Sequence, residues 1–238
     1  MPGAIIVGAS SGIGAALARE LAAHGYTLGL VARREDWLRQ LQAGLNVESY
    51  IKRIDVADPA SAIPLLAQLV SEMGDVELFV LNAGVGFLNR ELEWGPERET
   101  IEVNVLGFSA ALNVAFATLK ARGSGHIVGI SSIAALRGSR HAPAYGASKA
   151  FMSNYLEGIR HRCRRQGLDI TVTDIQPGFV RTAMAQGDRL FWMASAEKAA
   201  RQIYGAIAAK RPHAYVTRRW RLVAWLLKGL PRALYERT

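Results

Sequence analysis

The sequence has 238 residues, of which 50% are hydrophobic and 23 are glycine, which suits one α/β domain with a large core and many tight turns. The formal net charge is +9, but residues 210–238 contain eight Lys/Arg and one Glu, so the first 209 residues carry only +2. The basic character therefore belongs to a tail, and a near-neutral body argues against nucleic-acid binding.

Cysteine and histidine usage excludes further classes of protein. The single cysteine, Cys163, cannot form an internal disulfide, and the five scattered histidines do not predict a metal site. The chain starts almost directly in an apolar run, from which we expect no signal peptide, and no stretch reaches the roughly 18–20 apolar residues that span a bilayer. We expect a cytoplasmic protein.

The first unit of the chain has the pattern of a phosphate-binding turn. An apolar strand over residues 4–8 runs into Gly8-Ala9-Ser10-Ser11-Gly12-Ile13-Gly14, and a helix over residues 15–24 follows. Glycines let the backbone approach a pyrophosphate, and the helix N-terminus offers free N–H groups. The spacing differs from Gly-x-Gly-x-x-Gly, and a plain tight turn is the alternative, but the position between strand and helix favours dinucleotide binding.

The end of the second predicted strand, residues 26–31, bears on the choice of dinucleotide. A carboxylate is expected there in an NAD site, whereas this chain has Ala32-Arg33-Arg34. Two guanidiniums suit the 2′-phosphate of NADP through charge-assisted contacts. The alternative is a pair of solvated arginines at the start of the next helix.

The remaining elements alternate between helix and strand. We predict helices over 35–43, 59–73, 98–120, from Tyr145 to about 166, and 196–209, with strands over 47–54, 76–81, 126–130, 169–175 and 214–217. This alternation predicts a single-domain, doubly wound parallel α/β sheet with helices on both faces, over residues 1–217. A basic and apolar tail follows at residues 218–238.

Polar residues follow several of these strands. Asp55, Asn82 and Ser131-Ser132 stand at carboxyl ends, where open α/β sheets bind ligands, although turn and cap roles are common for such residues. Asn104 interrupts an apolar helical stretch, which indicates either a local role or a helix kink.

Tyr145 and Lys149 lie four residues apart and so share one face of a helix. A phenol has a pKa of roughly 10, and a nearby ammonium lowers it by about one to three units, which suits a general acid or base. Taken alone, such a pair is more often an ordinary exposed one.

The motifs occur in one order: Gly8-x-x-x-Gly12-x-Gly14, Asp55-Val56, Asn82-Ala83-Gly84, Asn104, Ser132, Tyr145-x-x-x-Lys149 and Pro177-Gly178-x-x-x-Thr182. In this order and spacing they resemble the classical short-chain dehydrogenase/reductase family over residues 3–217. The resemblance implies a Rossmann-type fold, a homodimer or homotetramer, and hydride transfer between a nicotinamide and a carbonyl or alcohol.

The resemblance also implies roles for four catalytic residues. Tyr145 would donate the proton to the carbonyl oxygen, and Ser132 would hydrogen-bond that oxygen. Lys149 would lower the pKa of Tyr145 and bind the nicotinamide ribose, and Asn104 would hold a water that feeds a proton relay.

The implied cofactor is NADP(H). Asp55 would bind the adenine edge and Val56 the adenine ring, and the NADP pattern rests on Arg33 and Arg34 alone, because the glycine loop has no basic residue. The other implied contacts come from the glycine loop, the end of the fourth strand and the motif after the sixth: Gly8, Ser10, Ser11, Gly12, Ile13, Gly14, Asn82, Ala83, Gly84, Pro177, Val180 and Thr182.

The substrate is less defined than the reaction. We expect pocket walls from residues 85–92, 133–144 and 183–194, and Leu190-Phe191-Trp192-Met193 favours an apolar or lipid-like substrate, unless it serves lid packing or an oligomer contact. The alternative to an enzyme is a nucleotide-binding regulatory protein without turnover, against which the four intact proton-transfer residues argue.

The tail combines apolar and basic residues. Trp220, Leu222, Val223, Trp225, Leu226, Leu227 and Leu230 are flanked by Arg218, Arg219, Arg221, Lys228 and Arg232. Such a segment suits a peripheral contact with an anionic inner membrane surface. The alternative is a tail buried in a subunit interface or over the substrate pocket.

Overall fold

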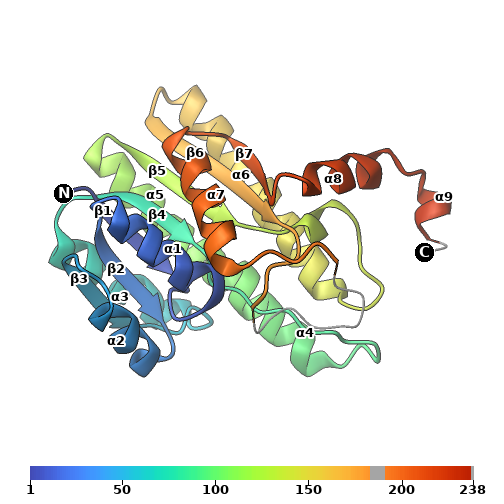
Figure 1. The fold of residues 1–238 in the computed structure, drawn as a ribbon, viewed down its shortest axis with the longest axis horizontal. Helices are drawn as coiled ribbons and strands as arrows, with labels where there is room; N and C mark the ends of the chain where they lie inside the picture. The colour runs from blue at the N-terminus through green and yellow to red at the C-terminus, as the bar shows by residue number, and fades with distance from the viewer. Residues whose placement is uncertain (183–190, 237–238) are drawn as a thin grey trace.

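The computed structural model describes residues 1–182 and 191–236, and its centre is a seven-stranded sheet (Figure 1). The strands are β1 (Gly3–Val7), β2 (Thr27–Ala32), β3 (Ser49–Arg53), β4 (Val76–Leu81), β5 (Ser124–Ile130), β6 (Asp169–Pro177) and β7 (His213–Val216). Every neighbouring pair is parallel, in the order β3-β2-β1-β4-β5-β6-β7. The predicted doubly wound parallel fold is confirmed.

Helices cover both faces of the sheet, each over its own apolar core. One face carries α1 (Gly12–Ala23), α2 (Glu35–Ala43) and α7 (Ala196–Ala208), and the other carries α3 (Pro59–Met73), α5 (Phe108–Arg122) and α6 (Pro143–Arg165). The inner strands are buried on both sides, as their continuous apolar runs predict. The carboxyl ends of all strands thus meet at one edge, between the two helical layers.

The helix ends follow local sequence signals. α3 has Pro59 in its first turn, and the Asp58 side chain accepts a hydrogen bond from the Ser61 N–H. Ser195 caps α7 in the same way by accepting from Lys198 N at 3.2 Å. These caps explain why the predicted starts of both helices agree with the structure. The division at residue 217 into a domain and a tail stays a prediction.

The expectation that no stretch is long and apolar enough to span a bilayer was wrong. α4 (Trp94–Ile101), a π-helical turn (Glu102–Gly107) and α5 form one helix of 29 residues, with a mean hydropathy of 1.4 over an 18-residue window. Of that window, 56% is buried within the protein, and α5 packs against α3, β4 and β5. Its apolar character therefore reflects a core helix, which a count of consecutive apolar residues missed.

The buried His126 makes stability depend on pH. Thr173 Oγ1 donates its only hydrogen to Arg211 O at 2.5 Å, so it accepts from His126 Nε2–H at 2.7 Å. Burial lowers the pKa of His126 from 6.5 to about 4.

Below pH 6.5 the unfolded chain therefore binds a proton that the folded chain excludes, and stability falls as the pH falls. We expect His126 to contribute a slope of up to about 1.4 kcal/mol per pH unit between 6.5 and 4. Urea unfolding at several pH values measures it, and His126→Gln should flatten the curve. An unchanged slope in that variant would contradict the assignment.

Candidate active site

The glycine loop forms a tight turn in which the three glycine positions do not accommodate a larger residue. Gly8 and Gly12 have φ values of 94° and 56°, which L side chains rarely adopt. A Cβ added to Gly14 would lie 2.0 Å from Gly8 O. α1 begins at Gly12, and no side chain among the described residues caps its N-terminus. The free N–H groups and the close backbone together form a cradle that fits a pyrophosphate.

The motif after β4 braces this turn. Asn82 Nδ2 donates to Gly8 O at 2.7 Å, and Ala83 N donates to Val7 O at 2.7 Å. Thr182 adjoins the turn as well, because a Cβ on Gly12 would lie 2.9 Å from its Cγ2. The Asn82 side chain is therefore committed to the protein backbone, and its expected place beside an adenosine rests on its position alone.

Arg34 supplies the cation that the glycine loop lacks in sequence. Its Nη2 donates to Ser10 Oγ at 3.0 Å and to Ser11 Oγ at 2.9 Å. The guanidinium also stacks over Trp37, 4.1 Å from the ring centroid. Two hydroxyls and a guanidinium thus gather beside the phosphate cradle, a set of donors that suits an anion.

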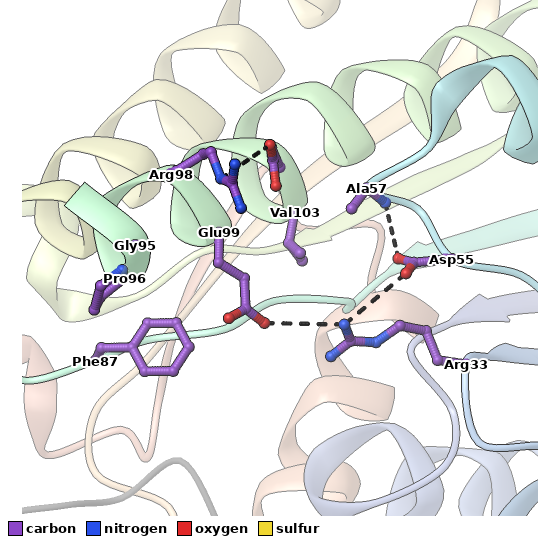
Figure 2. Close-up of a pocket in the computed structure, with 10 residues that line it drawn as sticks. Arg33, Asp55, Ala57, Phe87, Gly95, Pro96, Arg98, Glu99 and Val103 are labelled. Atoms are coloured by element: carbon purple, nitrogen blue, oxygen red, sulfur yellow. Dashed lines mark hydrogen bonds and ion pairs between the residues drawn. The ribbon is translucent and has the colours of Figure 1, made fainter.

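Arg33 lies in a different environment, a pocket of about 490 Å³ at the carboxyl ends of β2 and β3 (Figure 2). Its Nη1 is 4.0 Å from Asp55 Oδ2 and 3.9 Å from Glu99 Oε1. Asp55 also accepts from Ala57 N at 3.0 Å. The sequence did not single out Glu99, since its approach to Arg33 depends on how α4 packs over the sheet edge.

Asn104 is buried within the π-helical turn. Its Oδ1 accepts from Val85 N at 2.9 Å, and its Nδ2 donates to Val85 O at 2.8 Å and to Ser148 Oγ at 3.0 Å. A Cβ on Gly84 would lie 3.2 Å from Asn104 Oδ1 and 3.3 Å from Lys149 Nζ. The side chain therefore fixes the loop after β4 against α6, next to the lysine. A π turn often marks a functional position in a helix.

Tyr145 and Ser132 meet at the carboxyl end of β5. Burial raises the pKa of Tyr145, and a hydrogen bond with Ser132 acts in the opposite direction. The Tyr145 ring packs against Gly86, where an added Cβ would lie 2.7 Å from Cδ2. Ser132 also caps the short 3₁₀ helix Ile133–Leu136 by accepting from Ala134 N. The phenol is thus held in place and kept protonated at neutral pH.

The pKa of Tyr145 is shifted in the direction opposite to the one expected from its lysine neighbour. Lys149 Nζ lies 5.8 Å from the Tyr145 ring centroid but donates to Ile130 O at 3.0 Å and contacts Met152 Sδ at 3.5 Å. Burial is the largest influence on the phenol and outweighs the hydrogen bond with Ser132, so the pKa of Tyr145 is raised rather than lowered. Burial also lowers the pKa of Lys149 itself to about 8, although Asp174 counteracts it.

Asp174 is a buried carboxylate that the sequence analysis missed. Ser131 Oγ donates to its Oδ1, and Gln176 Nε2 donates to its Oδ2 at 3.1 Å. Gln176 Nε2 also donates to Ser153 Oγ at 3.1 Å, which links β6 to α6. The carboxylate raises the pKa of Lys149 and so favours the ammonium. An acid in the interior of a predicted strand, between Thr173 and Ile175, was the available signal.

The motif after β6 completes the edge. Pro177 ends β6, the buried Val180 pairs with Ala194, and Phe179, Phe191, Trp192 and Trp220 form an aromatic cluster beside them. Phe191 and Trp192 are 50% and 44% exposed, so the cluster presents aromatic surface to the outside.

Of the expected pocket wall at residues 183–194, residues 183–190 lie outside the described residues. Ile13 packs against the core, and Val56 is buried at the β3 end.

Comparisons with known proteins agree with this geometry. A family model described as short chain dehydrogenase matches residues 3–190. An uncharacterised oxidoreductase of Myxococcus xanthus (strain DK1622) is 37% identical over 188 residues, which cover 76% of this chain and 73% of the relative.

Two solved structures superimpose on most of the chain. A short-chain dehydrogenase/reductase from Burkholderia phymatum in complex with NAD has a TM-score of 0.83 at 27% identity, covering 94% of this chain and 92% of its own. An alcohol dehydrogenase from the archaeon Thermococcus sibiricus, complexed with 5-hydroxy-NADP, has a TM-score of 0.80 at 27% identity, covering 91% and 96%. The first of these structures thus contains NAD, and the second contains 5-hydroxy-NADP.

Proposed function

The chain belongs to the short-chain dehydrogenase family, and from that premise we propose that this oxidoreductase transfers a hydride between NADP(H) and a carbonyl or alcohol substrate. The observation that carries the proposal is the convergence of Asn104, Ser132, Tyr145 and Lys149 at the carboxyl edge of the sheet, next to the glycine cradle. A binding protein has no need of a protonated phenol and a buried lysine at this place.

In carbonyl reduction, Tyr145 gives its phenolic proton to the substrate oxygen. The phenol is protonated at neutral pH, because its ordinary pKa of 10.0 is already high and burial raises it further, so the proton to be donated is in place. The Ser132 hydroxyl donates its one hydrogen to the substrate oxygen and so orients the transfer. NADPH, when bound, supplies the hydride that reaches the carbonyl carbon.

Lys149 and Asn104 support the proton transfer from Tyr145 without contacting the substrate. The Lys149 ammonium binds the nicotinamide ribose and stabilises the phenolate that remains after proton transfer. Asn104 holds the loop after β4 by accepting a hydrogen bond from Val85 N through its Oδ1. The same oxygen has a second lone pair, and with this lone pair it accepts a hydrogen bond from a relay water.

The cofactor preference rests on the charges at the end of β2. Arg34 stands with the two serine hydroxyls beside the cradle, whereas Arg33 is opposed by Asp55 and Glu99. Arg34 is therefore the stronger candidate for the 2′-phosphate, and Arg33 the weaker one.

Arg34→Ala should weaken NADPH binding roughly 10–100-fold, because a hydrogen bond to a charged group contributes about 1.5–3 kcal/mol. NADH binding should change little, since NADH lacks the phosphate. Fluorescence titration of both cofactors measures the two dissociation constants. Arg98→Ala is the matched control, because Arg98 lines the Arg33 pocket but pairs with Glu102 at 3.6 Å. Equal affinity of the wild type for NADPH and NADH would contradict the preference.

We assign the substrate to the apolar or lipid-like class. Phe179, two residues after Pro177, belongs to the aromatic cluster with Phe191, Trp192 and Trp220. Part of this cluster is exposed. Aromatic surface at this edge favours apolar ligands over charged ones.

A turnover assay with NADPH tests the function as a whole. A panel of apolar and polar ketones should give NADPH oxidation that depends on the ketone, with apolar members preferred. Binding of NADPH without any turnover across the panel would instead favour the regulatory protein that uses this fold only to sense a nucleotide.

A further inference from the structure

The outer face of α8 (Trp220–Gly229) is apolar and exposed. Leu222, Trp225 and Leu226 are 66%, 78% and 58% exposed, and their spacing places them on one side of the helix. Trp220 and Ala224 lie on the opposite side and are buried. Figure 1 shows α8 and α9 (Arg232–Tyr235) extending away from the sheet, at the end of the molecule opposite β3.

Contacts with the body fix this orientation. The Trp220 indole lies flat on Gly178, where an added Cβ would come within 2.0 Å of the ring. Farther along the helix, Arg137 Nε donates to Leu227 O at 2.8 Å, and its Nη2 donates to Leu230 O. With both ends of the inner face attached, α8 cannot turn its apolar side toward the core.

Cations border the apolar face. Residues 210–235 contain seven Lys/Arg and no Asp or Glu. Helical spacing puts Arg221 and Lys228 on one border of the face and Arg219 on the other, and all three are exposed. Within residues 1–182 and 191–236, no ion pair joins any of these three to an acidic side chain.

We infer that α8 docks on the surface of an anionic membrane, with Leu222, Trp225 and Leu226 among the lipid headgroups and the bordering cations on their phosphates. A ten-residue helix cannot span a bilayer, but an exposed apolar stripe with tryptophan and flanking cations fits an interfacial helix. A second copy of the chain fits less well, because a two-fold contact through this face brings the same cations of both copies together.

Flotation of the full-length protein with phosphatidylcholine vesicles, with and without phosphatidylglycerol, tests the inference. The protein should float with the anionic vesicles at low salt and be released in about 1 M salt, where the Debye length is about 3 Å. Arg221→Gln/Lys228→Gln should lower the partition coefficient roughly 30-fold, the expected loss for two surface cations. Trp225→Ala/Leu226→Ala should lower it roughly 10-fold or more.

Point variants are preferable to a chain that ends at Thr217, because truncation would also strip Trp220 from Gly178. Leu92→Ala/Trp94→Ala is the matched control, since these residues are 64% and 68% exposed but lie elsewhere; it should float like the wild type. Failure to float with anionic vesicles at low salt would overturn the inference. So would equal flotation with neutral vesicles, or a Trp225→Ala/Leu226→Ala variant that changes oligomer mass and leaves flotation unchanged.

Discussion

Tyr145→Phe should lower turnover about 10²–10⁴-fold, because it removes the group placed to protonate the substrate oxygen while keeping the ring. The ring of the variant still packs against Gly86, so the fold and NADPH binding should survive. The lost hydrogen bond with Ser132 should cost about 1 kcal/mol of unfolding free energy at most. Steady-state kinetics, cofactor titration and urea unfolding of the same preparation measure the three quantities.

The control for this variant is Tyr155→Phe. Tyr155 lies on the same helix and packs against Phe108 and Phe151, away from the sheet edge. We expect its turnover to remain close to the wild-type value. If Tyr145→Phe retained most of the activity, another group would have to donate the proton, and the proposed mechanism would be wrong.

The order of strands and helices could be predicted from the sequence because it depends on local patterns. Buried strands are continuous apolar runs, and Pro59 and Ser195 mark helix starts through contacts within four residues. The glycine turn could also be predicted, since only glycine permits the φ of Gly8 and the approach of Gly14 to the backbone.

Contacts across the sheet edge could not be predicted in the same way. Ser131 and Asp174 are 43 residues apart and meet because β5 and β6 pair with Gly129 opposite Asp174. Arg33 and Arg34 are neighbours in sequence, yet one faces two carboxylates and the other two serine hydroxyls. Which partners they find depends on strand register and side-chain direction, neither of which a motif contains.

The pKa of Tyr145 also depends on tertiary contacts that the sequence motif does not contain. A spacing of four residues predicts a nearby ammonium and hence a lowered pKa, but it says nothing about burial. Gly86 packs against the Tyr145 ring, and Lys149 Nζ donates to Ile130 O. The desolvation that follows is a tertiary effect, and it reverses the sign.

Lys149→Met should abolish most of the activity, with turnover reduced about 10²-fold or more, because it removes the cation that stabilises the developing phenolate. It should also destabilise the fold by about 1–3 kcal/mol, since the buried Asp174 loses a positive neighbour and Ile130 O loses its donor. Kinetics and urea unfolding separate the two effects.

Asp174→Asn tests the carboxylate alone through the pH profile. Asp174 raises the pKa of Lys149, so its removal should move that pKa below about 8 and make activity decline at a lower pH than in the wild type. A purely structural role would change turnover without moving the alkaline limb. A limb that moved to higher pH would contradict the assigned sign.

The double variant Lys149→Met/Asp174→Asn distinguishes the chemical role of Lys149 from its structural one. With both charges removed, no uncompensated carboxylate remains, so most of the lost unfolding free energy should return. The amide that replaces the carboxylate can still accept from Ser131. After a flip of the Gln176 side-chain amide, it can also donate to Gln176 Oε1, which has no partner within the described residues. Activity should not return, because proton transfer still lacks the ammonium. If turnover recovered together with stability, Lys149 would serve the fold and not the reaction.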